Sequence, residues 1–269
     1  MLAYAVPYLL RTRKLAAAGR PVPRWRIWTF MAGLLTLVAA DITPVRNASD
    51  ETFAVHMVEH LMISDAAALL LVLGLTGPIM APVLRIGGLG WLRALAHPCV
   101  ALPVWALNLY AWHAPALYEG AVDHPWLHAL EHATFLFFGI MLWMALLGPL
   151  PKPAWFGNMA RLGYIVAARM IGAVLANVFL WSGTIFYKHT YPKASDQSLA
   201  GSIMMVEESL LTICLFGWLF LRAAKQSWES DELLELAAAN GIELDEERAK
   251  RAVAAGRGDD LRKRLVKPT

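Results

Sequence analysis

Long apolar runs separated by short polar segments dominate this 269-residue chain up to about residue 222. The runs cover roughly residues 1–10, 27–41, 53–80, 97–118, 126–148, 162–187 and 199–222. A run of about 20 apolar residues is long enough to cross a bilayer as a helix. The pattern therefore predicts an all-α, polytopic membrane helical bundle of about seven transmembrane helices, of which the first is short.

The pattern changes after residue 224. Residues 225–269 hold nine Lys and Arg residues against ten Asp and Glu residues, a mixture typical of solvated helices. Ser230 is a candidate helix start, and Asn240-Gly241 is a candidate stop. We therefore divide the chain into a transmembrane helical domain, residues 1–224, and a charged helical tail, residues 225–269.

Composition supports the membrane assignment, because 58% of the residues are hydrophobic and only 17% are charged. The two cysteines, Cys99 and Cys214, form no CxxC pattern, which argues against a disulfide framework or a thiolate zinc site. The basic residues lie at the ends of the runs and in the tail, without a recognisable nucleic-acid-binding motif. A nucleic-acid partner is therefore not expected, and the bilayer is.

The loop charges predict an orientation. The first loop is strongly basic, the third and fifth loops are basic, and the fourth is acidic. Since positive loops stay in the cytoplasm, the N-terminus and loops two, four and six are expected outside. The C-terminal tail is expected inside. The sixth loop, with Lys188 and Lys193 against Asp196, is the weakest support.

Two histidine pairs at i, i+4 spacing stand near the outer ends of apolar runs. Residues four apart share one face of a helix, and ionisable side chains within a membrane span are usually functional. Seven of the eight histidines are expected on the outer side, with His97 the exception. The sequence predicts a metal or haem site with the core ligands His56, His60, His128 and His132, and with His113, His124 and Met204 as further candidates.

Nearby residues refine the expected chemistry. Thioethers at Met57, Met62, Met204 and Met205 together with imidazoles suit copper better than magnesium or calcium. Glu59 and Glu131 each precede a histidine, so they lie about 100° away around the helix and are expected to orient an imidazole or carry a proton. The order of residues in 56–60 differs from the HExxH zinc-protease motif, which disfavours a membrane protease.

Asp65 is a further polar residue deep in the third run. An unpaired carboxylate is costly at this depth, so Arg169 or Asn177 is expected as its partner. A proton or ion step is its functional interpretation.

Three ordered blocks of the sequence resemble the multi-span CtaG family of bacterial cytochrome c oxidase assembly factors. The first block is His56-Met57-Val58-Glu59-His60 with the apolar run through Gly74 and Pro78. The second runs from Trp112-His113-Ala114-Pro115 to His128 and Glu131-His132. The third is Asp196-Gln197 with Ala200-Gly201 and Ile203-Met204. The sequence departs from the family in its short first helix, in Glu59 where a Gln is expected, and in its long tail.

The resemblance implies an assembly factor or metal chaperone rather than an enzyme, with copper as its metal and a haem-copper oxidase subunit as its partner. It also implies a bacterial inner (plasma) membrane location, and adds Asp196 to the residues expected to support the ligands. Two alternatives stay open: a membrane b-type cytochrome with bis-His haem ligation, and a copper-dependent membrane enzyme. A homo-oligomer also stays open.

Overall fold

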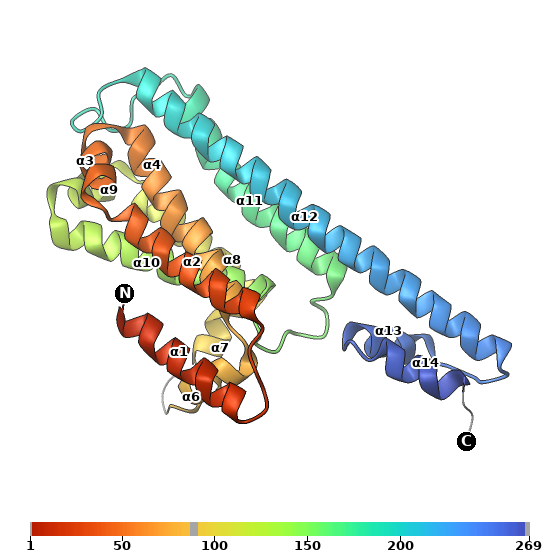
Figure 1. The fold of residues 1–269 in the computed structure, drawn as a ribbon. Helices are drawn as coiled ribbons and strands as arrows, with labels where there is room; N and C mark the ends of the chain where they lie inside the picture. The colour runs from red at the N-terminus through yellow and green to blue at the C-terminus, as the bar shows by residue number, and fades with distance from the viewer. Residues whose placement is uncertain (1, 87–90, 267–269) are drawn as a thin grey trace.

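The computed structural model describes residues 2–86 and 91–266. Every regular element within these ranges is a helix, which confirms the all-α prediction (Figure 1). Large apolar side chains remain exposed along these helices, among them Leu107, Val174, Ile213 and Leu221. Exposed apolar side chains on long apolar helices are what a bilayer requires.

Within residues 2–86 and 91–266, four helices are long and apolar enough to cross a membrane. They are the continuous helix Phe53–Gly74, α10 (Pro125–Leu146), α11 (Asn158–Trp181) and α12 (Ala194–Ala239). A fifth arises if α2 (Arg24–Ala40) and residues Val45–Glu51 of α3 (Thr43–Glu51), bent by 51°, form one broken span. Helices α1 (Leu2–Ala17) and α8 (Pro98–Trp112) have only 16 and 15 residues. The structure thus shows four or five candidate spans rather than the predicted seven.

Prolines shorten two of the predicted helices. The run 53–80 breaks after Gly74, and α6 (Gly77–Arg85) begins with Pro78 in its first turn. The run 97–118 breaks after Trp112, and α9 (Pro115–Asp123) begins at Pro115. Proline is favoured in the first turn of a helix and disfavours helical backbone in the residue before it. The apolar runs 53–80 and 97–118 therefore each form two helices rather than one.

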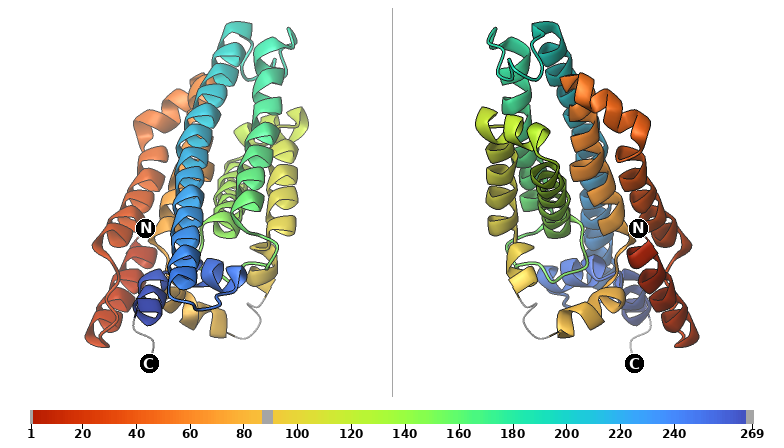
Figure 2. Two further views of the ribbon diagram at one scale, coloured as in Figure 1. Left: turned by 90° about the vertical axis from the view of Figure 1, so that its right-hand side faces the viewer. Right: turned by 90° about the vertical axis from the view of Figure 1, so that its left-hand side faces the viewer.

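The connections divide between two ends of the bundle (Figures 1 and 2). Helices α3 and α9 and the loop 182–193 lie at one end, which we call the α9 end. Helix α6, α7 (Trp91–Leu95) and the C-terminal helices lie at the opposite end. The first turns of α4, α10 and α12 therefore meet at the α9 end.

The tail continues the last span. Helix α12 runs unbroken through residue 224, so the predicted division lies within a helix and the predicted start at Ser230 is wrong. The predicted stop is confirmed: Asn240 is the C-cap, and Gly241 adopts a φ of 67°. Helices α13 (Glu246–Ala254) and α14 (Gly258–Val266) fold back onto α12 through a small apolar cluster of Leu233, Ala237, Val253 and Leu265.

A π-helical turn shapes the span Phe53–Gly74. The span consists of α4 (Phe53–Leu61), the π-helical turn Met62–Ala67 and α5 (Ala68–Gly74). Helix α10 crosses this turn closely at Gly139, where a Cβ would lie 2.2 Å from the Ser64 carbonyl oxygen. Only glycine allows this approach, which brings the first turns of α4 and α10 together. Such π turns often mark functional sites.

Candidate metal centre

The two histidine pairs come together in the structure, as the sequence predicts. His56 and His60 lie on α4, and His128 and His132 lie on α10. The Nε2 atoms of His56 and His60 are 2.9 Å apart. The ring centroids of His56 and His128 are 5.5 Å apart, and those of His60 and His132 are 5.4 Å apart. Two membrane helices therefore place four imidazoles in one cluster.

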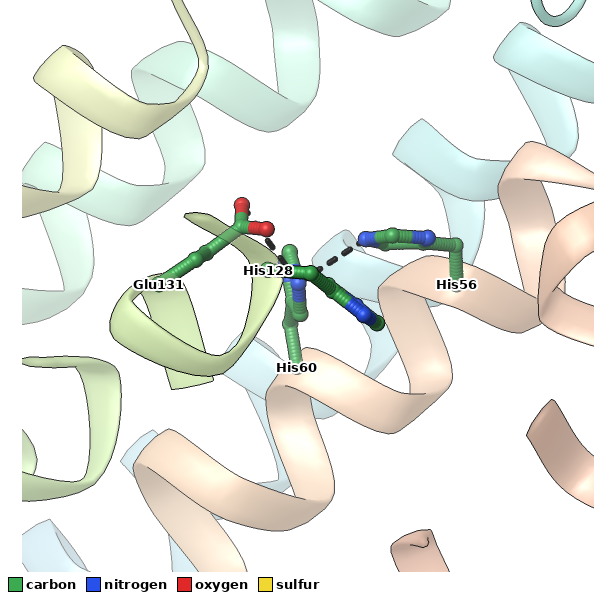
Figure 3. Close-up of side chains that lie close together, drawn as sticks. All are labelled: His56, His60, His128 and Glu131. Atoms are coloured by element: carbon green, nitrogen blue, oxygen red, sulfur yellow. Dashed lines mark hydrogen bonds and ion pairs between the residues drawn. The ribbon is translucent and has the colours of Figure 1, made fainter. Parts of the chain in front are cut away.

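Both glutamates join this cluster. Glu131 Oε1 lies 3.6 Å from His60 Nε2, and Glu59 Oε1 lies 3.8 Å from His132 Nε2, so each carboxylate faces a histidine of the other helix. One ligand atom from each of His56, His60, His128 and Glu131 lies within 4.8 Å of the others (Figure 3). A second group meeting the same limit consists of Glu59, His128 and His132.

We call the six side chains the His/Glu cluster: His56, Glu59, His60, His128, Glu131 and His132. Both helices carry the pattern His-x-x-Glu-His, in residues 56–60 and 128–132. The repeat is the sequence signal that could have placed the carboxylates among the ligand atoms. From their spacing, the glutamates were expected to orient an imidazole or carry a proton rather than to offer ligand atoms.

The His/Glu cluster is buried and short of hydrogen-bond partners. Glu59 and Glu131 are each 0% exposed, and none of their four carboxylate oxygens has a hydrogen-bond partner in the described residues. Nδ1 of His60 and Nε2 of both His128 and His132 likewise have no hydrogen-bond partner there. Buried polar groups without partners are costly. A metal cation would satisfy these atoms together, so the residues fit a metal ion.

The cluster is accessible from one side. A pocket of about 340 Å³ between α2, α3 and α10 is lined by Asp41, Arg46, His128 and His132, among others. The His132 side chain is 18% exposed, whereas His56 and His60 are buried. The pocket gives an ion a route to His128 and His132.

A tyrosine from the loop after α11 supports His56. The Tyr191 hydroxyl donates to the Ser49 carbonyl oxygen at 2.6 Å and lies 3.4 Å from His56 Nδ1. Burial raises the pKa of Tyr191, which keeps its hydroxyl protonated. Since that proton is directed to Ser49, a proton between Tyr191 and His56 belongs to the imidazole, and His56 Nε2 is left to accept a metal. Sequence reasoning missed Tyr191, because nothing local places this loop over α4.

Asp196 and His124, which the sequence also predicts at the site, lie outside the His/Glu cluster. Asp196, on α12, accepts hydrogen bonds from the backbone N–H groups of Phe53 and Ala54 at 2.7 and 3.1 Å. It therefore caps the first turn of the helix that carries His56 and His60, where a negative charge is favourable. His124 is exposed at the junction of α9 and α10 and is outside both ligand groups.

His113 and Met204 are buried beside the cluster. His113 Nε2 lies 3.4 Å from Met57 Sδ, and its ring centroid is 6.1 Å from that of His60. Met204 is 4% exposed and lines a small cavity with His60 and His113. Both residues are thus brought near the site, although neither belongs to the two ligand groups above.

A second buried polar cluster surrounds Arg169 of α11. Its guanidinium lies 3.0 Å from Asp65, 3.0 Å from Glu208 and 3.6 Å from Glu207. The predicted pairing of Asp65 with Arg169 is confirmed, whereas Asn177 instead donates to Ala173 and Met205. We call this set the Arg169 cluster.

Glycine makes room for the Arg169 cluster. A Cβ at Gly172 would lie 1.9 Å from Glu208 Oε1. The guanidinium also lies 5.3 Å from the Trp143 ring centroid on α10. Arg169 thereby links α11 to α10, to the π-helical turn and to α12.

One protein family matches most of this chain. The family model described as "Cytochrome c oxidase caa3 assembly factor (Caa3_CtaG)" matches residues 6–226. The chain belongs to this family. The match includes every residue of the His/Glu cluster and of the Arg169 cluster.

Curated relatives come from mycobacteria. "Uncharacterized protein Mb0105" of Mycobacterium bovis and "Uncharacterized protein MT0111" of Mycobacterium tuberculosis are each 26% identical over 247 residues. "Uncharacterized protein ML1998" of Mycobacterium leprae is 23% identical over 248 residues. Each alignment covers 82% of this chain and 37% of the relative, so the chain spans little more than a third of the relatives' length. No solved structure matches.

Proposed function

We propose that this chain binds copper as cargo at the His/Glu cluster and aids its insertion into a haem-copper oxidase. The observation that carries the proposal is the set of buried carboxylate and imidazole atoms without partners, facing one another from two helices. Family membership supplies the link to oxidase assembly. A haem-copper oxidase subunit is the partner that this role requires.

The donor set favours copper over the alkaline-earth ions. Imidazole suits copper and zinc, and neighbouring thioethers favour Cu(I). The pocket beside His128 and His132 suits a site that must release its ion. A resident catalytic metal needs a substrate position as well, and the proposed role does not. We therefore propose an assembly factor rather than an enzyme.

The packing of the imidazoles argues against haem. Neighbouring rings lie 4.1 Å apart for His128 and His132 and 4.4 Å apart for His56 and His60, measured between centroids. Facing rings of the two helices are 5.4–5.5 Å apart. A bis-His haem needs one imidazole on each side of a flat macrocycle, whereas these imidazoles pack against one another as a single cluster.

We further propose a seven-pass arrangement in the bacterial inner membrane, in which α1, α2 and α8 complete the set of spans. The N-terminus and the α9 end would face outward, and the tail, residues 225–269, would face the cytoplasm. The basic loop before α2 supports this orientation. The His/Glu cluster would then lie near the outer surface.

The assembly role predicts a specific defect. Deleting the gene should leave oxidase subunits synthesised but lower oxidase activity several-fold under copper limitation, because the copper centre is not filled. Added copper should restore part of the activity. Measuring oxidase activity and subunit abundance in parallel tests this, and a deletion strain with fully active oxidase under copper limitation would contradict the role.

The orientation predicts where fused reporters function. A reporter that works only in the cytoplasm should be active when fused after Thr269. The same reporter inserted into the loop 182–193 should be inactive, because that loop lies at the α9 end. The reverse result would place the His/Glu cluster on the cytoplasmic side.

A further inference from the structure

His113 presents a free nitrogen to a methionine sulfur. Its Nδ1 lies 2.7 Å from the Leu109 carbonyl oxygen. A carbonyl only accepts, so the proton of a neutral His113 belongs on Nδ1 and Nε2 carries a lone pair. This Nε2 lies 3.4 Å from Met57 Sδ. Since a thioether has no proton to donate, two lone-pair atoms face each other inside the protein.

The geometry of the pair fits two ligands of one ion. Ligands about 2.0–2.3 Å from a common ion, arranged tetrahedrally, lie roughly 3.5 Å from each other. His113 is 7% exposed and Met57 is 1% exposed, so no solvent donor reaches either atom. A cation between them would satisfy both lone pairs.

Space for such an ion lies beside the pair. A small cavity of about 20 Å³ is lined by Met57, His60, His113 and Met204, among others. This volume is about that of a single water-sized probe. Met204 brings a second buried thioether from α12 to the same cavity.

We propose that Met57, His113 and Met204 form a second metal site, suited to Cu(I), next to the His/Glu cluster. Two thioethers and one imidazole are soft, uncharged ligands, and Cu(I) is the first-row ion that prefers such a set. The inference deepens the proposed function and rests on it for the identity of the metal as copper.

His60 connects the two sites. Its Nε2 faces His56 and Glu131, whereas its Nδ1 is buried without a partner. The ring lines the same cavity as Met57 and His113. One imidazole thus borders both the hard, carboxylate-containing site and the soft one.

Methionine commonly fills hydrophobic cores, so a buried methionine indicates a metal ligand only where its sulfur faces a suitable partner. Met205 provides the contrast, since it is the neighbour of Met204 in sequence. Its Sδ accepts a hydrogen bond from Asn177 Nδ2 at 3.4 Å and is therefore satisfied. The Met57 sulfur faces an unprotonated nitrogen instead. Met205→Leu is thus a matched control for Met57→Leu and Met204→Leu.

The test is a Cu(I) titration of the purified full-length chain in detergent without oxygen, in competition with a Cu(I)-specific chelator, followed by X-ray absorption of the bound copper. The wild-type protein should bind Cu(I) with sulfur scattering at about 2.3 Å, the length of a metal–sulfur bond. Met57→Leu and Met204→Leu conserve volume. Each should lose about half of the sulfur signal, because one of the two thioethers is removed, and weaken one Cu(I) equivalent at least tenfold.

The possible results separate the two proposals. Met205→Leu should leave both the sulfur signal and the affinity unchanged. Copper bound only by nitrogen and oxygen in the wild-type protein would overturn the second site and leave the proposed function intact. An unchanged sulfur signal in Met57→Leu and Met204→Leu would also overturn it. A wild-type protein that binds no copper would overturn both.

Discussion

Replacing Arg169 by methionine is expected to lower the free energy of unfolding by about 3–5 kcal/mol, the range for removing one partner of a buried ion cluster. Three carboxyl groups surround this guanidinium, and Asp65, Arg169 and Glu208 are all less than 10% exposed. Without the arginine, these carboxyls would keep their burial and lose their only nearby cation in the described residues. Reversible unfolding in mixed detergent micelles measures the loss.

Two further variants make this prediction specific. Met170→Ala changes the neighbouring residue, which is 59% exposed, and should cost much less because it leaves the Arg169 cluster intact. Adding Glu208→Gln to Arg169→Met should recover part of the lost stability, since it removes a buried carboxylate. An Arg169→Met protein as stable as the wild type would show that the cluster does not hold these helices together.

His60→Ala is expected to have the largest effect on metal binding. His60 Nε2 lies within reach of both His56 and Glu131, and the residue borders the second proposed site as well. Supporting residues alone change metal affinity about 10–100-fold, so loss of this ligand should exceed about 100-fold. Copper content per purified, folded chain is the measurement. His132→Ala should also lose copper.

His97→Ala is the matched control for these variants. His97 caps α8 by accepting a hydrogen bond from the Cys99 N–H, and its ring lies 6.2 Å from that of Trp155. It lies far along the bundle from the His/Glu cluster, because α8 runs from His97 towards the α9 end. His97→Ala should therefore retain copper. Equal copper in His60→Ala, His132→Ala and wild-type protein would refute the ligand assignment.

The i, i+4 spacing predicted that the two histidines of each pair share one helix face, because this rule acts within a single helix. The position of each pair in the first turns of its helix also followed from the apolar pattern. The sequence did not predict that the side chains of Glu59 and Glu131 face histidines of the other helix. Their direction depends on how α4 and α10 are rotated against each other, which the close contact at Gly139 and Ser64 controls.

Long-range contacts explain the other differences. Asp196 contacts Phe53 across 143 positions in the sequence, and Tyr191 reaches Ser49 across 142. No local sequence pattern predicts a helix cap or a supporting hydrogen bond between residues so far apart in the chain. The breaks at Pro78 and Pro115, in contrast, can be read from the sequence, because proline interrupts a helical pattern.

The central claim is that the His/Glu cluster holds copper, and metal analysis of the purified wild-type protein combined with its optical spectrum tests it most directly. The account predicts bound copper in near-stoichiometric amount and no haem absorbance band. A haem band without copper would contradict the account and favour a membrane cytochrome.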